Sequence, residues 1–525
     1  MWPPDLCPAL QLLSTMNRAC TRAKSAGVTA LSCGFLVLAG LTPAFSQMQS
    51  GLNAPSASSA PYSSNAESSG SESSGSESIP AAAYSSTQSP FLSSVPEGKA
   101  TGTVLPLSFK EAIDRALRSN LGLLLSSDSS LTARGKKWEE LSRLLPNISA
   151  SANQSAQQID LAALGFRFNF PGVPPVVGPL GTFDARVYLS APLFDWHSIQ
   201  RERGARANEV AARYRYNDAR EMVVLAAGNE YLLSLSAAAR VDAAQAELET
   251  AQALFNKAQD QQAAGISPAI DTLRAQVELQ TRQQQLIVAR NNYSKQKLAL
   301  ARTIGLPPGQ EFNLTDQAPY KPLTPMSVDQ ALQRAYMGRA DYQAAAQEVR
   351  AAEQFRRAAT AEHLPTLDIS GNYGAAGVNV GDSHGVFLAG ATLAIPIFAG
   401  GRAHADALQA EATLRQSRQQ LESLRAQIDY DVRSALLDLT AANDQVQVAR
   451  SALDLASQTL VQARDRFSAG VADNLEVIEA QDAVASANEN YIGSLYAHNV
   501  AKVLLARAIG FAEQGVKQYL EGKDK

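Results

Sequence analysis

The chain has 525 residues, a net charge of −4 and only 18% charged residues. This balance gives no basic surface of the kind that binds nucleic acid, so we expect no nucleic-acid partner. Three cysteines, Cys7, Cys20 and Cys33, all lie near the start, which excludes a disulfide or cysteine–metal framework for the main body. Few aromatic residues, together with long stretches rich in Ala, Gln and Leu, indicate long helices rather than a compact enzyme core.

The first 46 residues have the pattern of a signal peptide. Arg18, Arg22 and Lys24 precede an apolar run over 28–41, which is too short for a comfortable membrane span but typical of an export signal. Small residues then predict cleavage before Gln47. The next segment, 47–106, is rich in Ser, Ala, Gly, Pro and Glu without periodicity, so we expect a disordered linker there.

The remaining chain is an internal duplication. The opening Leu107-Ser-Phe-Lys-Glu-Ala returns as Met326-Ser-Val-Asp-Gln-Ala, and each has the Ser and Glu/Gln spacing of a capping box. The ending Ala-Arg-Thr-Ile-Gly305 likewise returns as Ala-Arg-Ala-Ile-Gly510. We therefore expect a first repeat at 107–305 and a Pro-rich linker at 306–325. A second repeat follows at 326–510, and a polar tail at 511–525.

Each repeat contains a long helical hairpin. In the second repeat, apolar residues recur at seven-residue intervals from Val432 to Phe467, which predicts coiled-coil packing. The pattern stops at Gly470, which suits the left-handed residue that ends a helix. In the first repeat the same spacing starts at Ala237 and leads to Gly265. The sequence therefore predicts two antiparallel hairpins with tight tips.

Between the helices of each repeat, the apolar period changes to two, which is the period of a β-strand. Four such strands are expected, at about 147–153, 182–193, 366–374 and 386–396. Their lengths approximate those of tilted membrane strands, and the extra residues of the first repeat are expected in a loop over 154–181. Four strands cannot close a barrel, and an open sheet edge is not tolerated in lipid, so several copies must share one barrel.

The chain resembles the TolC family of outer-membrane efflux proteins over about 107–510. The resemblance rests on the duplicated openings, the Leu-Pro strand entries, Ile395-Pro-Ile-Phe-Ala-Gly-Gly-Arg402 and the segment 469–481. It implies a mixed α and β membrane protein: a homotrimer whose shared outer-membrane β-barrel, with four strands per chain, continues into a long periplasmic α-helical coiled-coil barrel. It also implies an equatorial linker at 306–325, contact with outer-membrane lipid, a periplasmic adaptor (membrane fusion) protein and an inner-membrane pump of RND or ABC type.

The hairpin tips are the expected functional region. The resemblance suggests adaptor docking there, through Gly265, Ser267, Phe467, Ser468 and Gly470. It also suggests that Asp271, Glu476 and Glu479, just after the tips, line or brace the periplasmic constriction of the pore. Three-fold symmetry would turn each acid into a ring that attracts cations. Acids early in a helix also favour its positive end, so both interpretations stay open for Asp271.

We expect no catalytic residues, metal site or cofactor. The five histidines lack metal-ligand spacing, and neither a nucleophile elbow nor a phosphate-binding Gly-Lys loop is present. A periplasmic adaptor would have one hairpin flanked by lipoyl-like strands, and a structural coiled-coil protein of the envelope would lack the period-two segments. The expected function is therefore a passive conduit from periplasm to exterior, as the outer-membrane channel of a tripartite efflux or type I secretion system.

Overall fold

The computed structural model describes residues 89–96, 98–161, 163, 165, 176–316, 320–323, 326–513 and 515. All of them belong to one unit, Pro80–Lys525. The expected signal peptide, the linker as far as residue 88, and nearly all of the expected tail lie outside the described residues.

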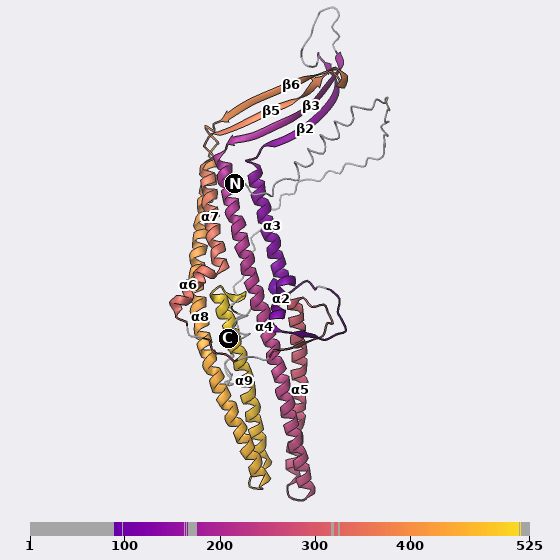
Figure 1. Cartoon of the computed structure of the whole chain (residues 1–525), viewed down its shortest axis with the longest axis vertical. Coiled ribbons are helices and arrows are strands. Elements are labelled where there is room, and N and C mark those ends of the chain that lie inside the picture. Colours follow the sequence, from indigo (N-terminus) through magenta and orange to yellow (C-terminus); the bar gives the residue numbers. More distant parts are fainter. Residues whose placement is uncertain are drawn as a thin grey trace, which may run out of the picture. The chain divides into compact units, whose positions relative to one another are not determined.

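The four strands of the two repeats form one antiparallel sheet in the order β2-β3-β5-β6 (Figure 1). Their bounds are Asn147–Asp160 for β2, Val176–Phe194 for β3, Thr366–Gly377 for β5 and Ser383–Ala394 for β6. The β2–β3 pair is longer than expected, so the connecting loop is shorter than 154–181. Backbone pairing continues through the Ser- and Gln-rich residues 154–157, where apolar alternation fades.

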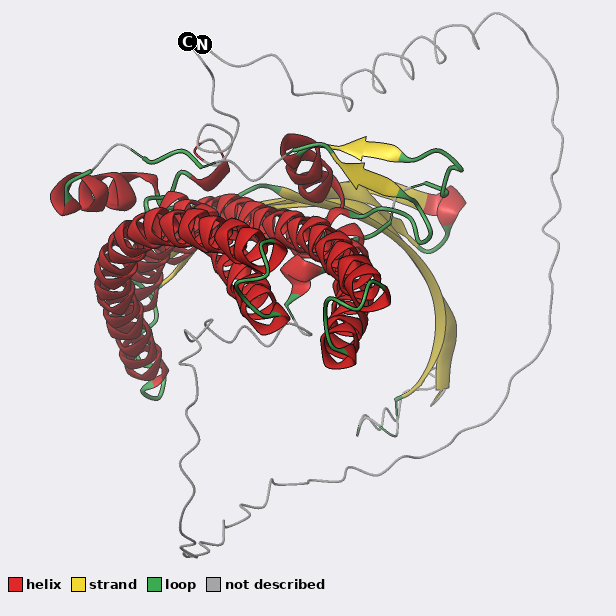
Figure 2. Cartoon of the chain, turned by 90° about the horizontal axis from the view of Figure 1, so that it is seen from below, coloured by secondary structure: helices red, strands yellow, loops and turns green. Residues whose placement is uncertain are grey.

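The sheet is curved (Figure 2). One of its faces has exposed apolar side chains, as a segment of a membrane barrel requires. Val187 pairs with Tyr373, and Tyr373 pairs with Phe387, so these three side chains share a face. They are 49%, 71% and 79% exposed, which is unfavourable in water and favourable in lipid. The opposite face includes the ion pair between Arg186 and Asp184, at 2.8 Å.

The helices continue directly from the sheet. Helix α3 is Leu121–Ser142 and precedes β2, while α7 is Ala340–Thr360 and precedes β5. Helix α4, Trp196–Ala263, follows β3 after a single residue, and α8, Arg402–Ser468, follows β6. These two helices have 68 and 67 residues. Each therefore extends about 100 Å, far more than the thickness of a bilayer.

Two helical hairpins end the long helices, as the coiled-coil pattern predicts. Helix α5, Ala269–Ile304, returns along α4, and α9, Asn474–Ala508, returns along α8 (Figure 1). Gly265 and Gly470 have φ angles of 71° and 74°, which are the left-handed conformations expected at the tips. A stretch of α4 is apolar enough to cross a membrane, but 56% of it is buried within the protein, as in a core helix.

The short helices at the start of each repeat also begin as expected. Helix α2, Phe109–Ser119, is capped by the Ser108 hydroxyl, which accepts a 3.3 Å hydrogen bond from the Glu111 amide. Helix α6, Val328–Gly338, has the same cap, from Ser327 to the Gln330 amide at 3.3 Å. The structural duplication therefore includes the local hydrogen bonds that start each repeat.

Ordered structure begins earlier and ends later than expected. Pro90–Leu92 forms a 3-10 turn whose Phe91 packs on the core, and Leu105–Leu107 (β1) pairs in parallel with Phe312–Leu314 (β4). The expectation of a disordered linker is therefore wrong over 89–96 and 98–106. The expected equatorial linker at 306–325 contains the strand β4. Likewise Ala512 is fully buried in the same core, which contradicts a polar tail starting at 511.

The end of α9 packs closely on the break between α6 and α7. Gly510 has a φ angle of 71°, and a Cβ there would collide with the backbone of Gly338 and Arg339. We predict that Gly510→Ala lowers stability by about 1–3 kcal/mol more than Gly309→Ala. Gly309 is also left-handed, with a φ of 84°, but a Cβ there would meet open space. Thermal unfolding of both variants measures the difference, and equal effects would contradict the close approach.

Candidate functional site

The two hairpin tips are held together by a small apolar core. It is formed by buried residues from α4, α5, α8 and α9: Leu254, Ala258, Ala275, Ala463, Phe467, Val477 and Ala480. Small residues dominate this set, so the helices approach closely around the one aromatic ring. The amide of Asn474 also donates a 3.0 Å hydrogen bond to the carbonyl of Asp271, which joins the start of α9 to the start of α5.

The predicted docking residues divide into exposed and buried positions. Gly265, Ser468 and Gly470 are exposed at the turns, and Ser267 is half-buried. Phe467, however, is only 6% exposed because it fills the core between the hairpins. Its predicted role in docking is therefore corrected: within one chain its side chain holds the tips together and is not available to a partner.

Two exposed apolar side chains, which the sequence analysis did not single out, occupy the turns themselves. Ile266 is 76% exposed and Val471 is 68% exposed, and each directly follows the left-handed glycine of its tip. Exposed apolar residues at equivalent positions of two neighbouring turns are a feature of interaction surfaces.

The predicted constriction acids also lie in different environments. Glu479 is exposed, and Glu476 is partly exposed and forms a 2.8 Å ion pair with Arg466 at the end of α8. Asp473 caps α9 by accepting a 3.3 Å hydrogen bond from the Glu476 amide. Asp271 is only 7% exposed and lies 3.7 Å from Arg274. Asp271 is therefore enclosed within the single chain, unlike Glu476 and Glu479.

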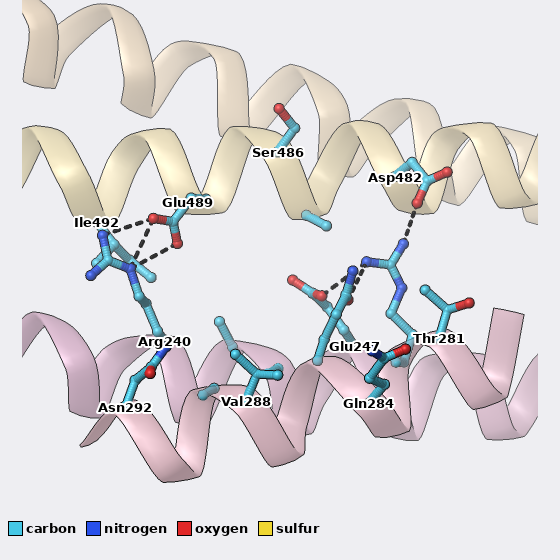
Figure 3. Close-up of a pocket in the computed structure, with 16 residues that line it drawn as sticks. Arg240, Glu247, Thr281, Gln284, Val288, Asn292, Asp482, Ser486, Glu489 and Ile492 are labelled. Atoms are coloured by element: carbon cyan, nitrogen blue, oxygen red, sulfur yellow. Dashed lines mark hydrogen bonds and ion pairs between the residues drawn. The ribbon is translucent and has the colours of Figure 1, made fainter. Parts of the chain in front are cut away.

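Above the tips, Arg282 connects the two hairpins through a network that the sequence analysis missed. Figure 3 labels two of its partners, Glu247 and Asp482. The Arg282 guanidinium contacts Glu278 on its own helix at 2.5 Å, Glu247 on α4 at 3.2 Å and Asp482 on α9. The Arg282 side chain is 4% exposed. A sequence signal did exist, because Arg282 occupies a seam position among Ala275, Leu279 and Leu286 that is otherwise apolar.

This network borders a groove of about 720 Å³ between α4, α5 and α9. At the other end of the groove, Arg240 pairs with Glu489 at 2.7 Å (Figure 3). Burial raises the pKa of Glu247, with Arg282 opposing the rise and Glu278 adding to it. The groove is thus lined by paired charges that join the first hairpin to the second at two levels. Among the described residues, no group of His, Cys, Asp and Glu could hold a metal ion.

A family model described as outer membrane efflux protein matches residues 139–306 and 331–511. These ranges each exceed the end of a repeat by one residue and together cover more than half of the chain. The chain belongs to this family. It is therefore an outer-membrane efflux channel, with its sheet in the outer membrane and its long helices in the periplasm. This family is one of channels rather than enzymes. An adaptor or a purely structural envelope protein is thereby excluded.

Similar proteins agree with this assignment. The chain is 23% identical over 407 residues to the alkaline protease secretion protein AprF of Pseudomonas aeruginosa, covering 74% of this chain and 82% of AprF. It is 23% identical over 347 residues to the outer membrane protein TolC of Escherichia coli, covering 62% and 69% of the two chains. The fold matches the Campylobacter jejuni CmeC outer membrane channel with a TM-score of 0.66 at 18% identity, covering 83% of this chain and 94% of CmeC.

The Arg282 network gives a direct test of how the hairpins are joined. We predict that Arg282→Met lowers stability by about 3 kcal/mol, because it leaves the buried Glu278 and Glu247 carboxylates without their cation. Arg240→Met in the same groove is the matched control and should cost less than about 1 kcal/mol, since both partners of its pair are largely exposed. Thermal unfolding of the two variants measures this contrast, and similar losses would show that Arg282 has no special role.

Proposed function

We propose that three copies of this chain form one channel by closing a shared twelve-stranded barrel. The observation that carries the proposal is the four-stranded sheet with an exposed apolar face, whose edge strands β2 and β6 have no partner among the described residues. In lipid, each unpaired backbone group costs several kcal/mol, so these edges need strands from other copies. Closure by three copies follows the quaternary structure that the family implies.

The long helices support the same assembly. On α8, the apolar residues Leu437, Val448 and Leu455 are 71%, 70% and 61% exposed in the single chain. On α5, Ile287 and Leu298 are 69% and 70% exposed. Apolar residues that face away from a helix's own hairpin fit a second seam against a neighbouring copy. Heat-resistant trimers in detergent-extracted outer membrane are the expected result, and a monomer under mild extraction would contradict the assembly.

The channel functions, in this proposal, as a passive conduit that docks a periplasmic adaptor, which in turn connects it to an inner-membrane pump of RND or ABC type. The matching family model is described as outer membrane efflux protein, and one relative is named for protease secretion, so both efflux and type I secretion fit the chain. The exposed Ile266 and Val471 at the tips support docking at that end.

The docking proposal is tested by crosslinking in cells. All three cysteines precede the predicted cleavage site, so a single Ser468→Cys variant gives one thiol at a tip. We expect this variant to capture a periplasmic partner, whereas Asn379→Cys, in the exposed β5–β6 connection, should not. If both variants give the same crosslinked products, the tips are not the docking surface.

The pore constriction is proposed at Glu476 and Glu479. They are three residues apart on α9, which places them on one helix face, and three copies would give two acidic rings. We expect a low-conductance, cation-selective channel that multivalent cations block from the periplasmic side. In planar bilayers, the Glu476→Ala, Glu479→Ala double variant should lose most of its selectivity and block. Unchanged cation selectivity would show that these residues do not form the constriction.

A further inference from the structure

A second ion-pair network lies midway along the helices, far from the tips and from the sheet. It gathers four carboxylates around two guanidiniums: Asp218 and Glu221 on α4, Asp341 on α7, Asp431 on α8, Arg507 on α9 and Arg339 at the break between α6 and α7. The α4 acids belong to the first repeat, and the other four residues belong to the second. The network is therefore a junction between the repeats.

Each guanidinium bridges different helices. Arg507 contacts Asp218 at 2.5 Å and Glu221 at 2.9 Å, and its distance to Asp341 is 3.7 Å. Arg339 contacts Asp341 at 2.7 Å and Asp431 at 2.9 Å. The two arginine side chains are 13% and 6% exposed, and Glu221 is 14% exposed. Solvent therefore screens these charges weakly, and their balance affects how tightly the helices pack.

The charges of the network do not cancel, because four carboxylates surround only two guanidiniums. With every acid ionised, the junction has two excess negative charges in a largely buried space. Burial raises the pKa of Glu221 to about 7, with Asp218 and Asp341 adding to the rise against Arg507. Burial also raises the pKa of Asp218. At Asp341, burial acts in the same direction but is outweighed by Arg339, which lowers the pKa of that carboxyl.

We propose that this network is a proton-operated clamp, in which a proton on the α4 carboxylates tightens the junction between the repeats and its loss as pH rises through neutrality loosens it. The clamp does not depend on which adaptor or pump the channel uses. The position of the network also suits control of helix packing. Gly510, three residues after Arg507, and Gly338, the residue before Arg339, bring α9 and the α6–α7 break into direct backbone contact.

The direction of the pH effect follows from linkage. Glu221 has an ordinary pKa of 4.5 in the unfolded chain and a raised one of about 7 in the folded chain. The folded state therefore holds a proton that the unfolded state releases as pH rises above 4.5. The free energy of unfolding is therefore highest at the acid end of the range between these two pKa values, and it falls as pH rises through 7. Above that range, ionisation of Glu221 changes it no further.

The test is the pH dependence of thermal unfolding of the purified full chain between pH 5.5 and 8.5. Glu221→Gln keeps the shape of the protonated acid and cannot ionise, so we expect it to lose at least half of the fall in unfolding temperature that the natural chain shows. Glu513→Gln is the matched control, because Glu513 pairs with Arg220 of α4 at 2.7 Å outside the network, and it should retain the full fall. An equal fall in the natural chain and Glu221→Gln overturns the clamp.

Amide hydrogen exchange of the natural chain provides a second measurement that needs no variant. After correction for the intrinsic effect of pH, exchange in peptides covering 214–224 and 340–346 should accelerate several-fold between pH 6 and 8.5. Peptides covering the tip core at 252–260 serve as the internal reference and should change little. If the junction and the reference respond equally, the network is not a local clamp.

Discussion

Backbone hydrogen bonding in lipid is the constraint on which the architecture depends. Every strand in the hydrocarbon region needs a paired neighbour on both sides, because no water replaces a missing partner. Within the chain, β3 of the first repeat pairs with β5 of the second, so the duplicated halves become one sheet. The remaining edges, β2 and β6, then need other copies, and this requirement links the fold of the monomer to its assembly.

The sheet in turn fixes where the long helices start. Helix α4 begins one residue after β3, and its cap is Asp195, whose carboxylate accepts a 3.1 Å hydrogen bond from the Ser198 amide. Pro192 lies at a register shift near the end of β3, where ladder pairing becomes irregular. A conduit that crosses the membrane as strands and the periplasm as helices thus changes secondary structure within a few residues.

Charged residues inside the helical region hold the two hairpins in place. The tip core is small and rich in alanine, so apolar burial there is limited, and Arg282 supplies a connection between α4, α5 and α9. Farther up, Arg507 and Arg339 connect α4 to α7, α8 and α9. Buried ion pairs contribute little net stability compared with apolar packing, but they favour one helix register and respond to charge and pH. Such connections therefore fix how the two hairpins are placed against each other more than they add to stability.

The sequence by itself determined the periodic elements. Seven-residue spacing predicted the coiled-coil seam from Val432 to Phe467, and period two predicted the four strands. Gly265 and Gly470 marked the tips. Each of these features depends on local backbone geometry. Tertiary structure decided what depends on neighbours far along the chain. Phe467 of the second hairpin is buried because it packs against the first hairpin. Asp271 of the first hairpin is buried next to the start of α9, where Asn474 donates a hydrogen bond to its carbonyl. The pairing of β1 with β4, the Arg282–Asp482 pair and the Arg507–Asp218 pair each join residues at least 200 positions apart. No local pattern specifies which acid meets which guanidinium.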